Sequence, residues 1–123
     1  MTARILVIDD SLLVRRKVTT ALQGLGYLFT EAVDGLDGLE KLAGLPDTKL
    51  IVCDVNMPRM SGIELLERLH AQGSRIPVVM LSTEGQPELV ARAKSLGAKG
   101  WIVKPFQAEF LLAAAAKLAP LVA

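Results

Sequence analysis

Residues 4–11 read RILVIDDS, and this stretch decides the fold. Its apolar run has no polar face, so residues 4–9 are predicted to form a strand that is buried on both sides of its sheet. Two carboxylates end the strand, and Ser11 is a residue type that caps a helix starting at the next position. The stretch therefore predicts a strand, a polar edge and a helix in immediate succession.

The same alternation of an apolar run and a helical pattern recurs along the whole chain. Strands that are apolar on both faces need helices on both sides, which indicates an α/β fold with a parallel sheet. Right-handed crossovers then favour a doubly wound, flavodoxin-like sheet of five strands in the order 2-1-3-4-5, with five helices on both faces. The strands are predicted at residues 4–9, 27–32, 50–54, 76–82 and 100–103, and the helices at 12–24, 35–45, 62–72, 87–96 and 106–118. On the first helix, the apolar face is assigned to Leu12, Leu13, Ala21 and Leu22, with Val14 and Val18 on an adjoining stripe.

Length and composition exclude several classes of protein. The chain has 123 residues, which predicts a single domain over residues 1–123. Its 51% hydrophobic and 22% charged residues exclude disorder, and its net charge of +1 gives no basic field for nucleic acid. The longest apolar run, residues 110–116, is too short to span a membrane. The start of the chain lacks the apolar run of a signal peptide, so a cytoplasmic location is expected.

The soft metal ligands are too few for a zinc site. Cys53 and His70 are the single cysteine and the single histidine. Cys53 is predicted to be a buried apolar residue and His70 to be solvated. Any bound metal must therefore be a hard cation held by oxygen atoms.

Charged and hydroxyl side chains follow the predicted strands, where ligands gather in such sheets. Asp9, Asp10 and Asp54 end the first and third strands, which are neighbours in the predicted order. At a separation of ~5 Å, each carboxylate pair repels by about 3 kcal/mol at an effective dielectric constant of ~20. Mg²⁺ together with Lys104, which follows the fifth strand, balances that charge. Ser82 ends the fourth strand.

Each of these residues also has a simpler interpretation. Asp10 is alternatively a helix cap, and Asp54 a loop residue. Ser82 is alternatively a strand-end hydroxyl bonded to backbone, and Lys104 a solvated turn residue. Four such strand ends at one edge favour the functional interpretation.

Four segments, taken in order, carry a resemblance to a known family: residues 8–11 (IDDS), 52–58 (VCDVNMP) with Gly62, 81–82 (LS) and 103–106 (VKPF). They resemble the receiver domain of two-component response regulators, and the resemblance covers residues 4 to about 118. The small size and the pair Asn56 and Glu84 resemble the single-domain chemotaxis regulators of that family.

The resemblance implies a phosphoryl acceptor at Asp54. It implies Mg²⁺ held by Asp10, Asp54 and the backbone carbonyl of Asn56, with Asp9 acting through a water molecule. Lys104 pairs with the carboxylate or phosphoryl oxygen, and a cis peptide bond joins Lys104 to Pro105.

The resemblance also implies a switch and a limited signal lifetime. Ser82 moves to the phosphoryl group, and the aromatic residue at the start of the fifth strand turns inward. Trp101 stands where the family usually has Tyr or Phe, and its size is expected to hinder an inward position; alternatively it is a fixed, half-exposed aromatic. Asn56 and Glu84 flank the path of the hydrolytic water, unless they are only solvated loop residues.

The partners that the resemblance implies are a histidine kinase or a histidine phosphotransfer protein. Arg15, Arg16 and Lys17 are either a solvated helix face or a docking patch for that donor. A downstream target is expected on the face made by the fourth helix, the fifth strand and the last helix. The protein is expected to be a monomer or weak dimer, without nucleic-acid or membrane contact, and a signalling protein rather than an enzyme.

Three alternatives remain open. One is a receiver-like scaffold that works without phosphorylation. Another is a phosphatase of the haloacid-dehalogenase type, from which the chain departs at Asn56 and Pro58. The third is a flavin carrier on the same fold, whose phosphate Asp9 and Asp10 repel.

Overall fold

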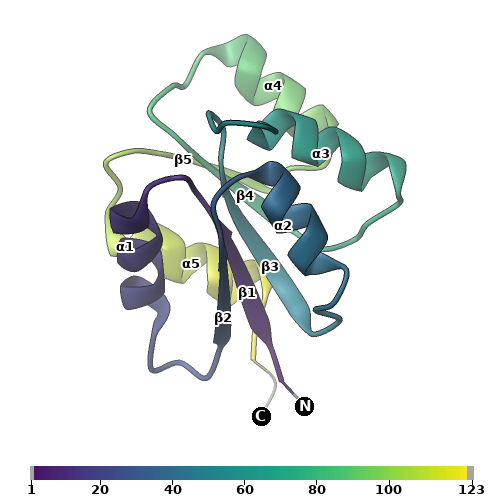
Figure 1. Cartoon of the computed structure of the whole chain (residues 1–123). Coiled ribbons are helices and arrows are strands. Elements are labelled where there is room, and N and C mark those ends of the chain that lie inside the picture. Colours follow the sequence, from purple (N-terminus) through teal and green to yellow (C-terminus); the bar gives the residue numbers. More distant parts are fainter. Residues whose placement is uncertain (1, 122–123) are drawn as a thin grey trace.

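Strands and helices alternate along residues 2–121, the part of the chain that the computed structural model describes (Figure 1). Each apolar run forms a strand and each amphipathic segment forms a helix. The elements are β1 (Arg4–Ile8), α1 (Leu12–Leu22), β2 (Leu28–Ala32), α2 (Gly35–Leu42), β3 (Thr48–Asp54), α3 (Gly62–Ala71), β4 (Val78–Ser82), α4 (Pro87–Ser95), β5 (Gly100–Val103) and α5 (Ala108–Leu118).

The five strands form one parallel sheet in the order β2-β1-β3-β4-β5. This confirms the predicted doubly wound topology. The order places β1 and β3 side by side at the point where the chain reverses its winding direction. The loops after these two strands therefore lie together at the carboxyl edge of the sheet.

Two apolar clusters, one on each face of the sheet, form the core. Because side chains alternate along a strand, Ile5 and Val7 of β1 enter one cluster, and Leu6 and Ile8 enter the other. The helices α1 and α5 cover the first cluster, and α2, α3 and α4 cover the second (Figure 1). These four apolar side chains of β1 are at most 1% exposed, which explains the absence of a polar stripe.

Several element bounds differ from those predicted. The strand β3 begins at Thr48, which pairs with Arg4 of β1, rather than at residue 50. The strand β4 begins at Val78, after Pro77, which lacks a backbone N–H. The helix α2 ends at Leu42 rather than at residue 45, and α5 begins at Ala108 rather than at residue 106.

The first turn of α1 does not face the core. Leu12 is 51% exposed and Leu13 is 75% exposed, so their predicted place on the buried face is wrong. Leu22 is buried as predicted, and Val18 of the adjoining stripe is buried as well. Two leucines are thereby left on the surface immediately after the acidic end of β1.

The amino edge of the sheet lies opposite the carboxyl edge, where the loops after β1 and β3 lie. Thr2 and Leu121 line one cavity of about 490 Å³ there, together with Lys49, Arg75 and Pro77. Thr2 and Leu121 are the first and last residues that the structure describes. Among residues 2–121, no helix has the length and apolarity needed to cross a membrane.

Candidate functional site

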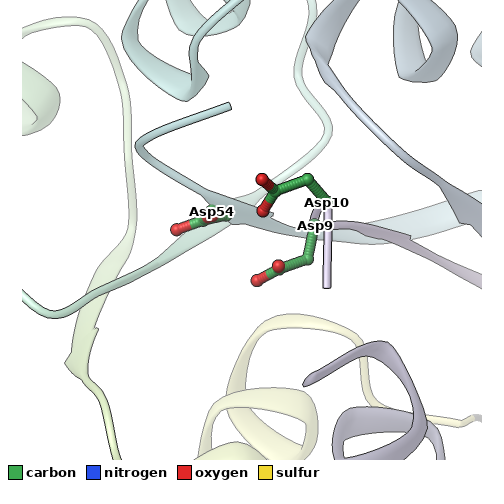
Figure 2. Close-up of side chains that lie close together, drawn as sticks. All are labelled: Asp9, Asp10 and Asp54. Carbon is green, nitrogen blue, oxygen red and sulfur yellow. The ribbon is translucent and has the colours of Figure 1, made fainter. Parts of the chain in front are cut away.

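Three carboxylates meet at the carboxyl edge of the sheet. Ile8 lies opposite Cys53 in the β1–β3 register, so the residues that follow them, Asp9 and Asp54, lie side by side. Asp10 extends from the same strand end toward Asp54 (Figure 2). One oxygen from each of the three residues lies within 4.8 Å of the others. Asp9 and Asp54 are buried, whereas Asp10 is exposed.

Lys104 bridges the two buried carboxylates. Its Nζ donates to Asp9 Oδ2 at 2.9 Å and lies 3.1 Å from Asp54 Oδ1. The pairing of Ser82 with Val103 and a hydrogen bond from Lys104 N to Ser82 O at 2.8 Å hold the lysine at this edge. The peptide bond from Lys104 to Pro105 is cis. Lys104 is thus a fixed part of the cluster and not a solvated turn residue.

The cluster has an excess of negative charge. Burial, followed by the nearby Asp9 carboxylate, raises the pKa of Asp54 above its usual range, although Lys104 opposes the shift. Burial lowers the pKa of Lys104, but hydrogen bonds to Asp9 and Asp54 outweigh it and leave that pKa raised. Lys104 therefore stays charged. Three carboxylates and one ammonium group carry a net charge of about −2 when all are ionised.

The backbone around Asp9 is fixed by two contacts. Ser11 N donates to Asp9 Oδ1 at 2.9 Å, and Arg15 Nη1 donates to the Asp9 carbonyl at 2.7 Å. Arg15 also pairs with Glu31 at 2.9 Å, so it is not part of a solvated face with Arg16. Sequence reasoning missed this role, because helical spacing alone does not show that a guanidinium folds back onto the preceding strand.

The Asp10 side chain is free for another role. Ser11 is the N-cap of α1, and its side chain accepts from Val14 N at 3.3 Å. The interpretation of Asp10 as a helix cap is therefore wrong.

A set of hydrogen bonds centred on Glu84 joins the two loops beside the cluster. The Oγ of Ser82, a buried residue, accepts from Glu84 N at 2.9 Å. Asn56 Nδ2 donates to Glu84 Oε1 at 3.0 Å, across the gap between the loops after β3 and β4. The two residues are therefore partners of each other and not independent solvated groups.

Trp101 on β5 contacts the same loop. Its Nε1 donates to the Glu84 carbonyl at 2.9 Å, and the ring packs against the core cluster that α2, α3 and α4 cover. The ring is half-buried in this position, and whether its size hinders an inward position stays a prediction. The N–H that requires a partner on burial has one.

The donor set suits a hard divalent cation. The three side chains that could hold a metal are all carboxylates, and Mg²⁺ prefers oxygen ligands. The excess charge of the cluster matches the charge of one such ion. Cys53 is buried beside the cluster, and burial raises the pKa of its thiol strongly, so it offers no thiolate ligand.

A second ion pair near the site was not predicted. Asp34 caps α2 by accepting from Asp37 N. Its carboxylate also accepts from Arg59, which lies in the loop after β3. No periodic pattern relates two loop residues 25 positions apart, so the sequence carried no signal for this pair.

Comparison with known proteins gives one consistent result. Residues 5–116 match the response regulator receiver domain family. The chain is 40% identical over 111 residues to the chemotaxis protein CheY of Treponema pallidum (strain Nichols), covering 89% of this chain and 77% of that protein. It is 39% identical over 111 residues to CheY1 of Helicobacter pylori (strain J99), covering 88% and 90% of the two chains.

Solved structures show the same likeness. The chemotaxis protein CheY4 of Vibrio cholerae, crystallised at low pH, superposes with a TM-score of 0.85 at 38% identity, covering 96% of this chain and 99% of that one. The CheX–CheY–BeF3–Mg²⁺ complex from Borrelia burgdorferi contains a chain with a TM-score of 0.87 at 27% identity, covering 94% and 87%. The flavodoxin-like fold is thereby confirmed by relatives of known structure.

Proposed function

Because the chain belongs to the response regulator receiver domain family, we propose that it accepts a phosphoryl group on Asp54 from a histidine kinase or a histidine phosphotransfer protein. The observation that carries this proposal is the convergence of Asp9, Asp10 and Asp54 with Lys104 at one edge of the sheet. Four charged groups in one crevice cost stability, so their meeting indicates a ligand that needs them.

Mg²⁺ is the cofactor in this proposal. Asp10, Asp54 and the backbone carbonyl of Asn56 would hold it, and Asp9 would act through a bound water molecule. When bound, the ion screens the negative charge of the incoming phosphoryl group and stabilises the group in transfer. The carboxylate-only donor set and its excess charge support the assignment.

Asp54 supplies the nucleophile. Val55 N donates to Asp54 Oδ1 at 2.9 Å, and Lys104 contacts the same oxygen, which fixes the carboxylate in one orientation. Within residues 2–121, no hydrogen bond reaches the second oxygen, Oδ2. A bond forms from Asp54 to phosphorus while the phosphorus–nitrogen bond of the donor histidine breaks, giving an acyl phosphate. Lys104 then pairs with a phosphoryl oxygen.

The switch acts through Ser82 and Trp101. A phosphoryl group adds a charge of about −1.5 to −2 and three acceptor oxygens. The Ser82 hydroxyl donates to one of them and changes its contact with Glu84 N. Because Glu84 also accepts from Trp101, the loop after β4 and the ring on β5 respond together.

Return to the resting state is hydrolysis of the acyl phosphate. Water attacks phosphorus, inorganic phosphate leaves and the Asp54 carboxylate is regenerated. Asn56 and Glu84 flank the cluster, and their mutual hydrogen bond sets the space open to that water. They tune the lifetime of the signal.

The donor docks on α1. Leu12 and Leu13 are exposed at the start of α1, next to a groove of about 670 Å³ that Arg16, Lys17 and Phe106 help to line. Apolar side chains beside a basic rim suit a helix that carries the phosphohistidine.

The output face is formed by α4, β5 and α5. Val103, Phe110 and Leu112 are exposed there at 52%, 56% and 38%. A downstream protein binds this face when Trp101 and the loop after β4 have shifted. A related CheY from Borrelia burgdorferi has been crystallised with CheX, BeF3 and Mg²⁺, which supports output by protein contact.

The protein acts as a signalling component of the cytoplasm and not as an enzyme with a free substrate. We expect a monomer or weak dimer that contacts neither nucleic acid nor membrane, in line with its net charge of +1.

Labelling with acetyl phosphate tests the proposal. With Mg²⁺, intact-mass measurement should find one added phosphoryl group, and chelation of the metal should remove it. Asp54→Asn should abolish labelling, and Asp10→Asn should weaken it strongly. Asp47→Asn is the control, because Asp47 pairs with Arg4 at the amino edge of the sheet. It should label like the unaltered chain.

Other outcomes support other functions. A chain that neither labels nor binds beryllofluoride with Mg²⁺ is a scaffold that works without phosphorylation. Sustained turnover of phosphate monoesters through Asp54 would instead indicate a phosphatase.

A further inference from the structure

The loop between β3 and α3 has an unusual turn at Arg59. Met60 N donates to Pro58 O at 2.7 Å, which closes a three-residue turn around Arg59. The φ angle of Arg59 is 62°, the one positive value among the non-glycine residues that the structure describes. Turns of this kind with a positive central φ are rare and strained. Such a backbone persists only where other contacts hold it.

One of those contacts is the ion pair with Asp34. Arg59 Nε donates to Asp34 Oδ2 at 2.7 Å, and Arg59 Nη2 donates to Asp34 Oδ1 at 3.2 Å. The pair is bidentate, which adds geometric specificity to charge. Asp34 is 2% exposed and precedes α2, so its carboxylate is a fixed anchor on a different loop.

A backbone contact beside the ion pair holds the same turn. Gly35 N donates to Met60 O at 3.0 Å. A Cβ on Gly35 would lie only 2.7 Å from that oxygen, so glycine is required for the approach. Two consecutive residues at the start of α2 therefore bind the loop between β3 and α3. Asp34 does so through its side chain, and Gly35 through its backbone.

The two ends of the loop are held as well. Val55 N donates to the Asp54 carboxylate, and Gly62 N donates to Val55 O at 2.9 Å. Asn56 lies between these fixed points and the turn at Arg59. Its backbone carbonyl is the one metal ligand that the proposed function takes from the backbone rather than from a carboxylate.

We infer that the Asp34–Arg59 pair is a positioning device that presets the carbonyl of Asn56 for Mg²⁺. This inference rests on the proposed function. A ligand carried by a loop binds well only when the loop is ordered before the metal arrives, because ordering on binding costs affinity. Arg59 touches no ligand itself and acts through the turn, as a positioning residue.

Arg59→Asn is the informative variant. Asparagine tolerates a positive φ, so the turn remains possible while the ion pair is lost. Mg²⁺ titration, followed by the amide NMR shifts of Val55 and Asn56, should show affinity weakened about 3- to 10-fold, near or below the range for partners that touch a ligand directly. Hydrogen exchange at the amides of Met60 and Gly62, measured without Mg²⁺, should be faster.

Two further variants separate positioning from general stability. Arg92→Gln removes another ion pair, with Glu67, in which the arginine side chain has the same 54% exposure. It should leave Mg²⁺ affinity and loop exchange unchanged. Arg59→Lys keeps the positive charge but not the bidentate hydrogen bonding of the guanidinium, and it should recover part of the Mg²⁺ affinity. This variant also keeps the inference testable if Arg59→Asn fails to fold.

The outcomes distinguish the two proposals. If the unaltered chain binds Mg²⁺ and Arg59→Asn binds it equally well, the positioning role is refuted and the proposed function stands. If the unaltered chain binds no Mg²⁺, the proposed function is refuted, and the positioning role falls with it. If Arg92→Gln weakened Mg²⁺ binding as much as Arg59→Asn does, the effect would come from a general loss of stability. That result would also refute the inference.

Discussion

The indole Nε1 of Trp101 donates a hydrogen bond to the backbone carbonyl of Glu84 at 2.9 Å, which ties β5 to the loop after β4. Glu84 N in turn donates to the Ser82 hydroxyl. Two hydrogen bonds through Glu84 therefore connect the Trp101 ring to Ser82. The chain contains one tryptophan. Its fluorescence therefore reports on this loop without interference from another indole.

Beryllofluoride with Mg²⁺ should change the emission of Trp101. When Ser82 donates to the phosphoryl mimic, Glu84 shifts and the environment of the indole changes with it. We expect a saturable change in emission maximum or intensity during titration. Asp54→Asn should show no change, and a silent signal in the unaltered chain despite bound mimic would contradict this coupling.

Lys104→Gln should destabilise the metal-free protein by about 1–3 kcal/mol. The loss leaves Asp9 and Asp54 buried without a cation; the figure is below that for a fully buried pair because the Lys104 side chain is 16% exposed. Mg²⁺ should raise the melting temperature more in this variant than in the unaltered chain. The control is Lys41→Gln, at an exposed pair with Asp37, where a change of at most about 0.5 kcal/mol is expected. Equal Mg²⁺ effects in variant and unaltered chain would contradict the prediction.

Asp54→Asn should stabilise the metal-free protein at neutral pH by about 1 kcal/mol, since one charge leaves a repulsive cluster. Folding raises the pKa of Asp54, so its ionisation opposes folding, and the penalty grows as pH rises through the interval between the unfolded and the folded pKa. Below the usual aspartate range the carboxyl is neutral in both states, and the gain should vanish. Urea unfolding of Asp54→Asn and of the unaltered chain, at neutral and at acidic pH, measures the gain in stability under each condition. A loss of stability at neutral pH would show that pairing with Lys104 outweighs repulsion by Asp9.

The ion pair at Arg59 should make stability depend on acid pH. The hydrogen bond from Arg59 lowers the pKa of Asp34, although burial opposes the shift. Its contribution is therefore present above the usual aspartate pKa and lost as pH falls through the lower folded value. Arg59→Asn should lower the free energy of unfolding at neutral pH, and only modestly because the arginine side chain is half exposed. The difference in free energy of unfolding between Arg59→Asn and the unaltered chain should become smaller as the pH falls. A difference that does not change with pH would contradict an origin in the ion pair.

Gly62→Ala should cost about 2–3 kcal/mol. A Cβ at this position would overlap the Asp54 carbonyl oxygen, which is part of β3 and cannot retreat. Gly44→Ala is the matched control, because the nearest atom to its added Cβ is 3.8 Å away. It should change the free energy of unfolding by at most about 0.5 kcal/mol. Similar costs for the two substitutions would show that the loop after β3 yields easily.

The topology was predictable because the chain repeats one physical signal. A strand such as residues 5–8, apolar throughout, requires cover on both faces, and right-handed crossovers then leave few arrangements. Element ends were less predictable, because they depend on single backbone groups. Pro77 lacks the N–H that would extend β4, and Thr48 joins β3 only through its pairing with Arg4. The burial of α1 was predicted correctly at Leu22 and wrongly in its first turn, because hydrophobicity alone placed Leu12 and Leu13 inside.

The acidic cluster was predictable for a similar reason. Parallel strands deliver their last residues to one edge, so Asp9 and Asp54 were expected to meet once β1 and β3 were neighbours. Contacts between loops carry no such rule. The reach of Arg15 back to Asp9, and of Arg59 across to Asp34, depends on side-chain direction and on one unusual φ angle, which a single sequence does not encode in any period.

Thr2 and Leu121 share the wall of one cavity at the amino edge of the sheet, whereas Asp54 ends β3 at the carboxyl edge. This arrangement makes the chain suitable for fusion to another protein, for immobilisation and for circular permutation. A fluorescent protein or an immobilising linker attached at this edge leaves the reactive crevice unobstructed. A short peptide joining Thr2 to Leu121 is compatible with circular permutation, with the new opening placed in any surface turn remote from the carboxylates.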